Sequence, residues 1–326
     1  MPLWCMSSLR STTMTMPSHL RFGTRGSKLA LRQTALATEA FRAAHPSISV
    51  EIVRIKTQGD TRQNRPLSEV GGSGFFTKEL EQALLSNTID VAVHSLKDLP
   101  AQLARGLCLS AVLKRENPLD VLVSEKKTRL LDLPAGAKIG TSSLRRTALL
   151  HIVRPDIIVV PVRGNIETRI RTMRTQGIDA LILAYAGLAR LGIDHLIAEI
   201  IPPHLMLPAP GQGAIALEAR ATDTTTLSWL KKINHARTFS EISAERAFLE
   251  SLDAGCQVPL GCLAQRQGDK LFVPGCIATP DGSRICTATV SGMAYNAALL
   301  GSELAARLRT QGGAEILAAW RGKTGR

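Results

Sequence analysis

Aromatic side chains are scarce in this sequence. Of 326 residues only 12 are aromatic, seven Phe, three Trp and two Tyr, and none stands among the basic motifs described below. Proteins that bind single-stranded nucleic acid usually place aromatic rings among their cations, so that bases can stack on them. No stretch approaches the roughly 18 consecutive apolar residues that a membrane-spanning helix needs. We therefore expect neither a nucleic-acid partner nor a membrane.

Cysteine is also sparse and irregularly spaced. The six cysteines are Cys5, Cys108, Cys256, Cys262, Cys276 and Cys286. Secreted disulfide scaffolds space their cysteines densely and regularly, and zinc sites usually pair them two residues apart. Neither pattern occurs here, so we expect a reducing, cytoplasmic location and no metal.

Nucleotide-binding and export signals are missing as well. The segment "GGSGFF" lacks the spacing of a dinucleotide fingerprint, and the terminal "RGKTGR" has Leu317 where a phosphate loop requires glycine. Residues 1–19 contain no acid and no apolar core of secretory length. They could be a weak organelle-targeting peptide, a disordered tail or the result of a misplaced start codon; we favour one of the last two.

Positive charge is what the sequence has in excess. The net charge is +13, and Arg outnumbers Lys by 28 to 12. A guanidinium group donates two parallel hydrogen bonds to a carboxylate or phosphate, which an ammonium group does not. An arginine-rich surface would give the same count. The positions of the arginines must therefore decide between solvated charge and an anion site.

Short apolar runs alternate with amphipathic segments from Leu20 onward, which is typical of parallel sheets with crossover helices. We expect strands at 20–24, 48–56, 90–95, 120–124, 157–162, 179–184 and 213–220, and helices at 27–44, 77–87 and 165–177. The motif at 138–153 predicts a strand followed by a helix. After residue 239 we expect a helix at 240–252, strands at 271–277 and 285–290, and a helix at 293–310.

These elements predict two α/β lobes and a small α+β C-terminal domain. The Pro-rich segment "IPPHLMLPAPGQG", residues 201–213, interrupts the second of these α/β units. No internal repeat or low-complexity tract is present.

Polar motifs follow four of the predicted strands: "FGTRGSK", "HSLKD", "GTSSLRR" and "VRGNIETR". Open α/β sheets bind ligands at strand ends. In "GTSSLRR" the hydroxyls and the helix N-terminus form an anion cradle, although an ordinary helix cap has the same residues. Arg145 and Arg146 oppose the helix dipole there, so an anion should lie nearby.

The motif "HSLKD" contains three groups that hold or move protons. His94 is a general base or a structural hydrogen-bonding residue, and Lys97 forms a Schiff base or binds carboxylates. Asp98, a carboxylate among many cations, is suited to hold a cationic intermediate or to accept hydrogen bonds from N–H groups. In "LDAGCQVPLGC", Cys256 is either a reactive thiol in a turn or a small buried residue.

Seven motifs resemble, in order and spacing, those of the porphobilinogen deaminase, or hydroxymethylbilane synthase, family. They are "TRGSKLALRQ", "AVHSLKDLP", "GTSSLRR", "RGNIETR", "LAYAGLARLG", "LPAPGQGAIALE" and "GCQVPLG". The resemblance runs from Leu20 to about residue 320. It implies two lobes like those of periplasmic binding proteins and a third domain that carries the cofactor. On this basis residues 1–19 are an extension, 20–114 and 214–232 form lobe 1, 115–213 form lobe 2, and 236–326 form the C-terminal domain. Residues 201–213 are then the return crossing from lobe 2 to lobe 1.

The resemblance also implies an activity. The family's cofactor is a dipyrromethane primer, held here through a thioether to Cys256, and Asp98 is the catalytic carboxylate. Four porphobilinogen molecules add head to tail with loss of ammonia, and water then releases hydroxymethylbilane for tetrapyrrole and haem synthesis. We expect a cytoplasmic, monomeric transferase whose partner is this small substrate.

Further site residues come from the same resemblance. Those matching the cofactor-binding positions are Ser27, Lys97, Thr141, Ser142, Ser143, Arg145, Arg146 and Gly164. Those matching the substrate-binding positions are Arg25, Phe76, Arg163, Arg169, Arg190 and Gln212. Ser73 stands where the family usually has Lys, so its loop adds less positive charge to the cleft.

Solute-binding proteins and the effector regions of transcription regulators are also built from two lobes. A two-lobed solute binder would need an export signal, and the effector lobe of a regulator would need a helix-turn-helix segment. Neither feature precedes Leu20. The sequence therefore favours the enzyme.

Overall fold

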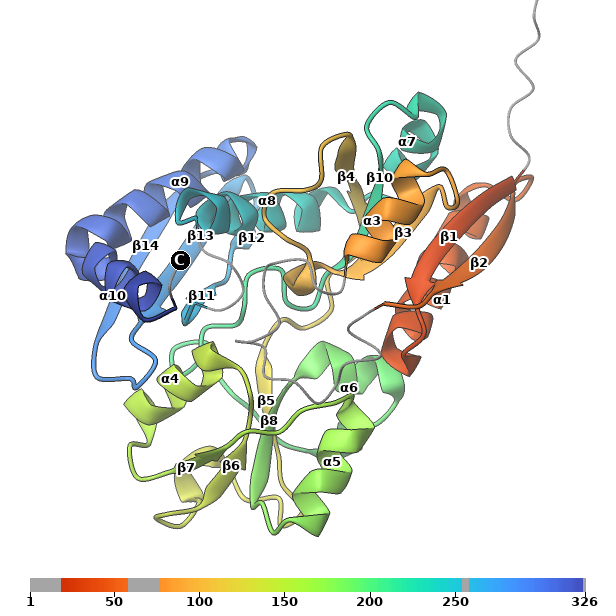
Figure 1. The fold of residues 1–326 in the computed structure, drawn as a ribbon. Coiled ribbons are helices and arrows are strands. Elements are labelled where there is room, and N and C mark those ends of the chain that lie inside the picture. Colours follow the sequence, from red (N-terminus) through yellow and green to blue (C-terminus); the bar gives the residue numbers. More distant parts are fainter. Residues whose placement is uncertain (1–18, 58–76, 254–257, 325–326) are drawn as a thin grey trace, which may run out of the picture.

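The computed structural model describes residues 19–57, 77–253 and 258–324. Within these ranges the strands form three sheets, each with helices packed on it (Figure 1). Two sheets are five-stranded and belong to α/β lobes, and the third is smaller and belongs to an α+β region. The predicted fold class is confirmed. The residue bounds proposed for the domains stay a prediction.

Lobe 1 is built on a sheet with the strand order β2-β1-β3-β10-β4. Its core lies between this sheet and α1, around the buried rings of Phe22 and Phe41. Its elements are β1 (His19–Arg25), α1 (Lys28–Ala44), β2 (Ser49–Ile55), α3 (Lys78–Leu85), β3 (Val91–Ser95), the 3₁₀ helix η1 (Leu96–Asp98), β4 (Leu107–Val112), β10 (Ile215–Arg220) and α7 (Thr224–Lys231).

Lobe 2 repeats this plan with the order β7-β6-β8-β5-β9. Buried aliphatic side chains cover both faces of its sheet. Its elements are β5 (Asp120–Val123), η2 (Leu130–Asp132), β6 (Lys138–Gly140), α4 (Leu144–Val153), β7 (Ile158–Val160), α5 (Ile166–Thr175), β8 (Ala180–Ala184), α6 (Tyr185–Leu191), η3 (Asp194–Leu196) and β9 (Ile197–Ile200).

The sheets are mixed rather than parallel, which corrects the expectation from the sequence. β10 runs antiparallel to β3, with Ile215 opposite Ser95, and β5 runs antiparallel to β8, with Asp120 opposite Ala184. Each of these strands is reached by a crossing from the other lobe. The outgoing crossing, residues 113–119, leads to β5, and the return crossing, residues 201–214, leads to β10. The chain therefore enters each sheet at the end where β3 or β8 leaves it, and it must run in the opposite direction.

The C-terminal region packs helices on a small antiparallel sheet. β11 and β12 both pair with β13, and β14 pairs with the opposite edge of β13. Its elements are α8 (Ala236–Ser251), β11 (Leu260–Cys262), β12 (Gln265–Gln267), β13 (Lys270–Ala278), β14 (Ile285–Met293), η4 (Ala294–Asn296), α9 (Ala297–Leu308), the π-helical turn η5 (Arg309–Gly313) and α10 (Ala314–Thr324).

Several element boundaries differ from those predicted. α8 begins before residue 240, because the His235 ring accepts a hydrogen bond from the Thr238 N–H at 3.2 Å and caps the helix. α9 begins at Ala297, because β14 extends to Met293 and a 3₁₀ turn follows it. The strands and helices without a counterpart in the prediction are β4, α6, β9, α7, β11, β12 and α10. β4 and β9 are edge strands, and their sequence patterns are weak.

A buried ion pair joins both crossings to the C-terminal region. The Arg115 guanidinium donates to both carboxylate oxygens of Glu245, at 2.7 and 3.0 Å. Glu245 also accepts from the backbone N–H groups of Gly211, at 2.5 Å, and Ala264, at 2.8 Å. Its side chain is fully buried. One carboxylate therefore fixes the outgoing crossing, the return crossing and the loop after β11.

We predict that Glu245→Gln lowers the free energy of unfolding by about 3–5 kcal/mol, because it leaves the Arg115 charge buried and uncompensated. Glu303, paired with Arg307 at 2.9 Å on the exposed face of α9, provides a control. There Glu303→Gln should cost no more than about 0.5 kcal/mol. Urea denaturation measures both values, and equal losses would contradict the structural role of Glu245.

Candidate active site

The turn that follows β3 is anchored by leucine and presents polar groups. Leu96 and Leu99 are each 2% exposed and lie in an apolar cluster with Ala214 and Ala216 of the return crossing and β10. The Leu96 N–H donates to the Ala214 carbonyl at 3.1 Å. The alternation of leucine with Lys97 and Asp98 in "SLKDL" therefore leaves Lys97 half-buried and Asp98 exposed.

His94 supports this turn from inside lobe 1. Its Nε2 lies 2.9 Å from Oε2 of Glu218, and both side chains are buried. Because His94 is on β3 and Glu218 is on β10, the contact joins the two strands directly before the turn. This arrangement favours the structural interpretation of His94 over a general base.

The polar groups of "GTSSLRR" lie at the start of α4 in lobe 2. The Ser143 hydroxyl caps the helix by accepting from the Arg146 N–H at 3.4 Å. The Ser142 hydroxyl donates to the Val162 carbonyl at 3.0 Å, and Thr141 Oγ1 accepts from the Ser143 N–H at 3.2 Å. These bonds order the loop, and they engage all three hydroxyls within lobe 2.

The start of α5 provides a second helix N-terminus. Asn165 caps it by accepting from the Thr168 N–H at 2.8 Å. Gly164 has φ +99°, and a Cβ there would meet the Thr168 side chain at 2.9 Å, so this position needs glycine. The Arg169 Nε donates to the Gly164 carbonyl at 2.8 Å, which fixes the side chain next to this turn.

Arg145 and Arg146 share an internal anion, Asp120. Arg145 Nη1 donates to Asp120 Oδ2 at 2.6 Å, and Arg146 donates to Oδ1 from Nε at 3.1 Å and from Nη2 at 2.7 Å. The sequence predicted an anion near these arginines, but it did not identify this one. Asp120 precedes the arginines by a whole strand and loop and reads as the first residue of an apolar run, so no local signal marked it.

Gln212 connects the two lobes at this point. Its side-chain amide donates to Asp120 Oδ1 at 2.9 Å and to the Pro118 carbonyl at 2.7 Å, and its Oε1 accepts from Lys97 Nζ at 3.4 Å. Gln212 is only 1% exposed. The return crossing therefore links the turn that carries Asp98 to the buried carboxylate of lobe 2.

The pKa values show that cations from both lobes share one electrostatic field. Burial lowers the pKa of Lys97 to about 8, Arg146 and Arg145 lower it further, and Asp98 and Asp120 oppose them. Burial and the charges of Arg146 and Arg163 lower the pKa of Arg169 to about 10, with Asp98 again opposing.

The turn between β1 and α1 lies at the junction of the lobes. Ser27 caps α1 by accepting from the Ala30 N–H at 3.2 Å, and Arg25 is the last residue of β1. Lys28 Nζ lies 3.2 Å from Glu167 Oε1 of α5 in lobe 2. This contact places the turn with Arg25 and Ser27 next to lobe 2.

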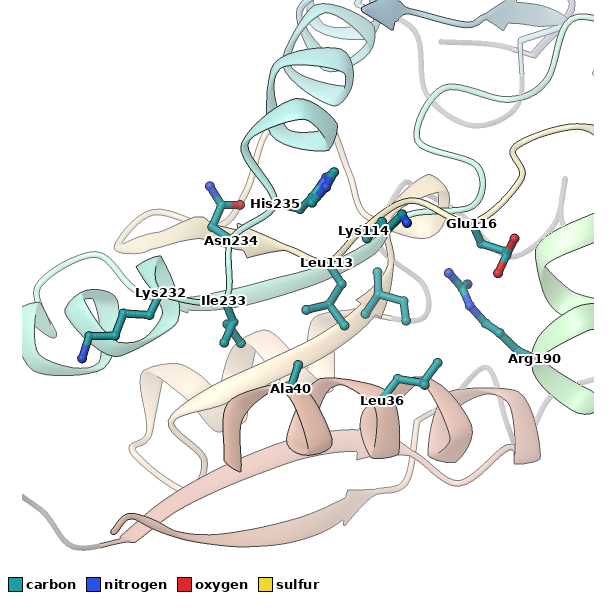
Figure 2. Close-up of a pocket in the computed structure, with 11 residues that line it drawn as sticks. Leu36, Ala40, Leu113, Lys114, Glu116, Arg190, Lys232, Ile233, Asn234 and His235 are labelled. Atoms are coloured by element: carbon teal, nitrogen blue, oxygen red, sulfur yellow. The ribbon is translucent and has the colours of Figure 1, made fainter. Parts of the chain in front are cut away.

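Arg190 lines a pocket to which the other predicted arginines do not contribute. This pocket, of about 540 Å³, is lined by Leu36 and Ala40 of α1 and by Glu116 of the outgoing crossing. Figure 2 shows Arg190 and Glu116 near each other at one end of it. Arg190 donates to the Gly213 carbonyl at 2.6 Å, and burial lowers its pKa to about 10 against the opposing charge of Glu116. Arg190 thus contacts the return crossing.

Three predicted positions cannot be placed. Cys256, Phe76 and Ser73 lie outside the described residues. Among the residues that are described, no group of three His, Cys, Asp or Glu side chains could hold a metal ion. In the same part of the chain, no helix has both the length and the apolar character to cross a membrane.

The fold and site define a class of protein. Two α/β lobes of equal topology contribute a lysine and arginines whose pKa values respond to the charge of one exposed aspartate, Asp98, and these arginines lie beside the N-termini of α4 and α5. Such a site suits an acidic small molecule bound between lobes.

Comparison with known proteins agrees with this class. Residues 20–228 match the family "Porphobilinogen deaminase, dipyromethane cofactor binding domain", and residues 239–310 match "Porphobilinogen deaminase, C-terminal domain". The porphobilinogen deaminase of Syntrophomonas wolfei is 50% identical over 92% of this chain and 98% of its own length. That of Desulforudis audaxviator is 48% identical over 91% of this chain and 96% of its own. The chain belongs to the porphobilinogen deaminase family.

Solved structures give only weak overlaps. The VFT2 domain of Bordetella pertussis BvgS has a TM-score of 0.42 at 15% identity, covering 71% of this chain and 92% of that domain. The methionine-binding protein MetQ has a TM-score of 0.41 at 14% identity, covering 67% of this chain and 89% of its own. These scores are too low to carry an argument. The fold rests on the sheets described above.

The donors in the site fit the dipyrromethane cofactor of this family, which is acidic. Among the described residues, Arg145 donates only through Nη1, to Asp120 and to the Leu207 carbonyl. Its Nε and Nη2 therefore remain for a carboxylate. Burial lowers the pKa values of Lys97 and Arg169, neighbouring cations lower them further, and added negative charge would relieve this repulsion.

We predict that the affinity of the site for a dicarboxylate such as succinate falls as pH rises from 7 to 9. With a pKa of about 8, Lys97 is largely protonated below that pH and loses its charge above it, while the carboxylates of the probe stay ionised. The loss should reach about tenfold in Kd by calorimetry. Lys97→Arg keeps its charge and should show a flat profile; a flat wild-type profile would disprove the assignment.

Proposed function

We propose that this chain is a transferase that joins four porphobilinogen molecules head to tail, with loss of ammonia, on a covalently bound dipyrromethane primer. Water then releases hydroxymethylbilane for tetrapyrrole and haem synthesis. The observation that carries this proposal is the convergence of cations from both lobes around the exposed carboxylate of Asp98. Family membership supplies the identity of the substrate.

The cationic groups would hold the carboxylates of the primer and the substrate. The residues that would bind the primer are Ser27, Lys97, Thr141, Ser142, Ser143, Arg145, Arg146 and Gly164, with Cys256 as its attachment point. The dipyrromethane, when bound, supplies the pyrrole carbon to which each new unit is joined. Arg25, Arg163 and Arg169 would bind the substrate, and Phe76 would lie beside its ring.

Arg190 and Gln212 were also predicted to bind substrate. Their contacts support a different part in the reaction, because Arg190 donates to the return crossing and Gln212 connects Lys97 to Asp120. We propose that both keep the lobes in register. They would thereby position the groups that do contact the substrate.

Asp98 would act as the catalytic carboxylate. It lies in the field of Lys97, Arg146 and Arg169, whose pKa values all respond to its charge. An ionised carboxylate accepts hydrogen bonds from pyrrole N–H groups and stabilises the positive charge that appears as ammonia leaves. The surrounding cations hold the acidic side chains of the substrate, so that the carboxylate faces the ring rather than its acid groups.

Burial of three of the other cysteines supports Cys256 as the attachment point. Burial raises the pKa of Cys262 well above its usual value, that of Cys276 to about 11, and that of Cys108 as well. The thiolate is the nucleophilic form of cysteine, so these three thiols are poorly reactive.

We also propose that the enzyme is a cytoplasmic monomer that binds no nucleic acid.

We predict that the intact mass of the purified protein exceeds the sequence mass by one dipyrromethane. Cys256→Ser should remove this excess, because serine cannot form the thioether. Cys286→Ser, at a partly exposed thiol that donates to the Gln311 carbonyl at 3.1 Å, is the matched control and should keep it. A wild-type mass without the excess would favour a non-catalytic binder.

We predict that Asp98→Asn lowers kcat by about 100-fold or more, because it removes the charge that stabilises the cationic transition state. Binding of succinate should be retained, since all the cations remain in place. Steady-state kinetics and calorimetry separate the two effects. Near-normal turnover would assign the catalytic role to another residue.

A further inference from the structure

We propose that Asp120 is a positioning residue of this site, an internal carboxylate that holds Arg145 and Arg146 in place until the carboxylates of an acidic ligand contact them. The identity of that ligand rests on the proposed function. The role of Asp120 itself rests on its contacts, its burial and its place in the fold.

The contacts of Asp120 are numerous for one side chain. Arg145 donates to Oδ2, and Arg146 and Gln212 donate to Oδ1. Asp120 has no exposed surface. Burial acts to raise its pKa, but Arg145 and Arg146 hold that pKa well below the usual range. Asp120 therefore stays ionised at any pH at which the protein functions.

The charges of these three groups do not cancel. One carboxylate faces two guanidinium groups on adjacent residues, at a helix N-terminus whose dipole also repels them. Asp120 offsets part of this repulsion and fixes both side chains, while one net positive charge remains for a ligand. Arg145 and Arg146 are only 6% and 5% exposed, so a ligand would meet groups already oriented by Asp120.

The position of Asp120 connects it to the catalytic turn. It is the first residue of β5, at the end of the outgoing crossing, and Gln212 on the return crossing contacts it. Gln212 in turn accepts from Lys97, the neighbour of Asp98. A single carboxylate thus orders cationic groups that belong to different lobes.

Asp120→Asn tests this role, because it keeps the shape of the side chain and removes its charge. The unliganded variant should melt at a lower temperature, and its Kd for succinate should rise about tenfold, because Arg145 and Arg146 are then no longer held in place for the ligand. Loss of a merely structural contact would lower the melting temperature and leave the Kd of the folded variant unchanged. Asp120→Glu restores the charge and should return Kd toward the wild-type value.

The matched control is Asp156→Asn. Asp156 accepts from Arg154 at 2.8 and 2.6 Å on the surface of lobe 2, outside the site. Its loss should leave the Kd for succinate unchanged. Calorimetry at constant ionic strength, with chloride as the reference salt, gives these values.

If Asp120→Asn does not fold, rescue of its folding by added salts still tests the proposal. Folding restored by succinate, and not by chloride, would support the proposal, since the added carboxylates replace the missing one. No rescue of an unfolded variant by succinate, or an unchanged Kd for succinate in a folded variant, would overturn it. The mass excess on Cys256 is measured separately, so failure of this proposal and failure of the proposed function are distinguishable.

Discussion

Repulsion among cations is the constraint on which this site depends. Lys97 comes from lobe 1, whereas Arg145, Arg146 and Arg169 come from lobe 2. Besides burial, the charges of neighbouring arginines lower the pKa values of Lys97, Arg146 and Arg169. Such a group of charges is unfavourable unless carboxylates lie among them. Asp120 provides this compensation inside the protein, and Asp98 provides it at the surface. The remaining positive charge is what an acidic ligand would satisfy.

The topology of the two lobes brings these groups together. Because β5 and β10 enter their sheets at the ends where β8 and β3 leave them, both crossings pass between the lobes at the strand ends that carry the polar motifs. Asp120 begins β5 directly after the outgoing crossing, and Gln212 and Gly213 lie on the return crossing, where the Gly213 carbonyl accepts the hydrogen bond from Arg190. The crossings are therefore part of the site as well as connections between its halves.

The C-terminal region is joined to both crossings rather than to one lobe alone. Glu245 of α8 holds Arg115 and Gly211, and Cys276 of β13 packs in the core of lobe 2. The segment that would carry the primer thus belongs to a domain anchored at the junction of the lobes. This arrangement suits a tethered ligand that must lie between the lobes.

The sequence by itself determined the α/β pattern, the helix start in "GTSSLRR" that Ser143 caps, and the motifs that assign the family. These are properties of short segments, in which apolar spacing and capping residues act over a few positions. Cys256 and Phe76 were predicted from the same motifs, and their positions stay a prediction.

Only the tertiary structure decided which charges meet. It identified Asp120 as the partner of Arg145 and Arg146, placed Arg190 in a separate pocket, and made the sheets mixed. The physical reason is that an ion pair between Asp120 and Arg146 depends on the path of the crossings, whereas local sequence determines only that each residue begins a strand or a helix.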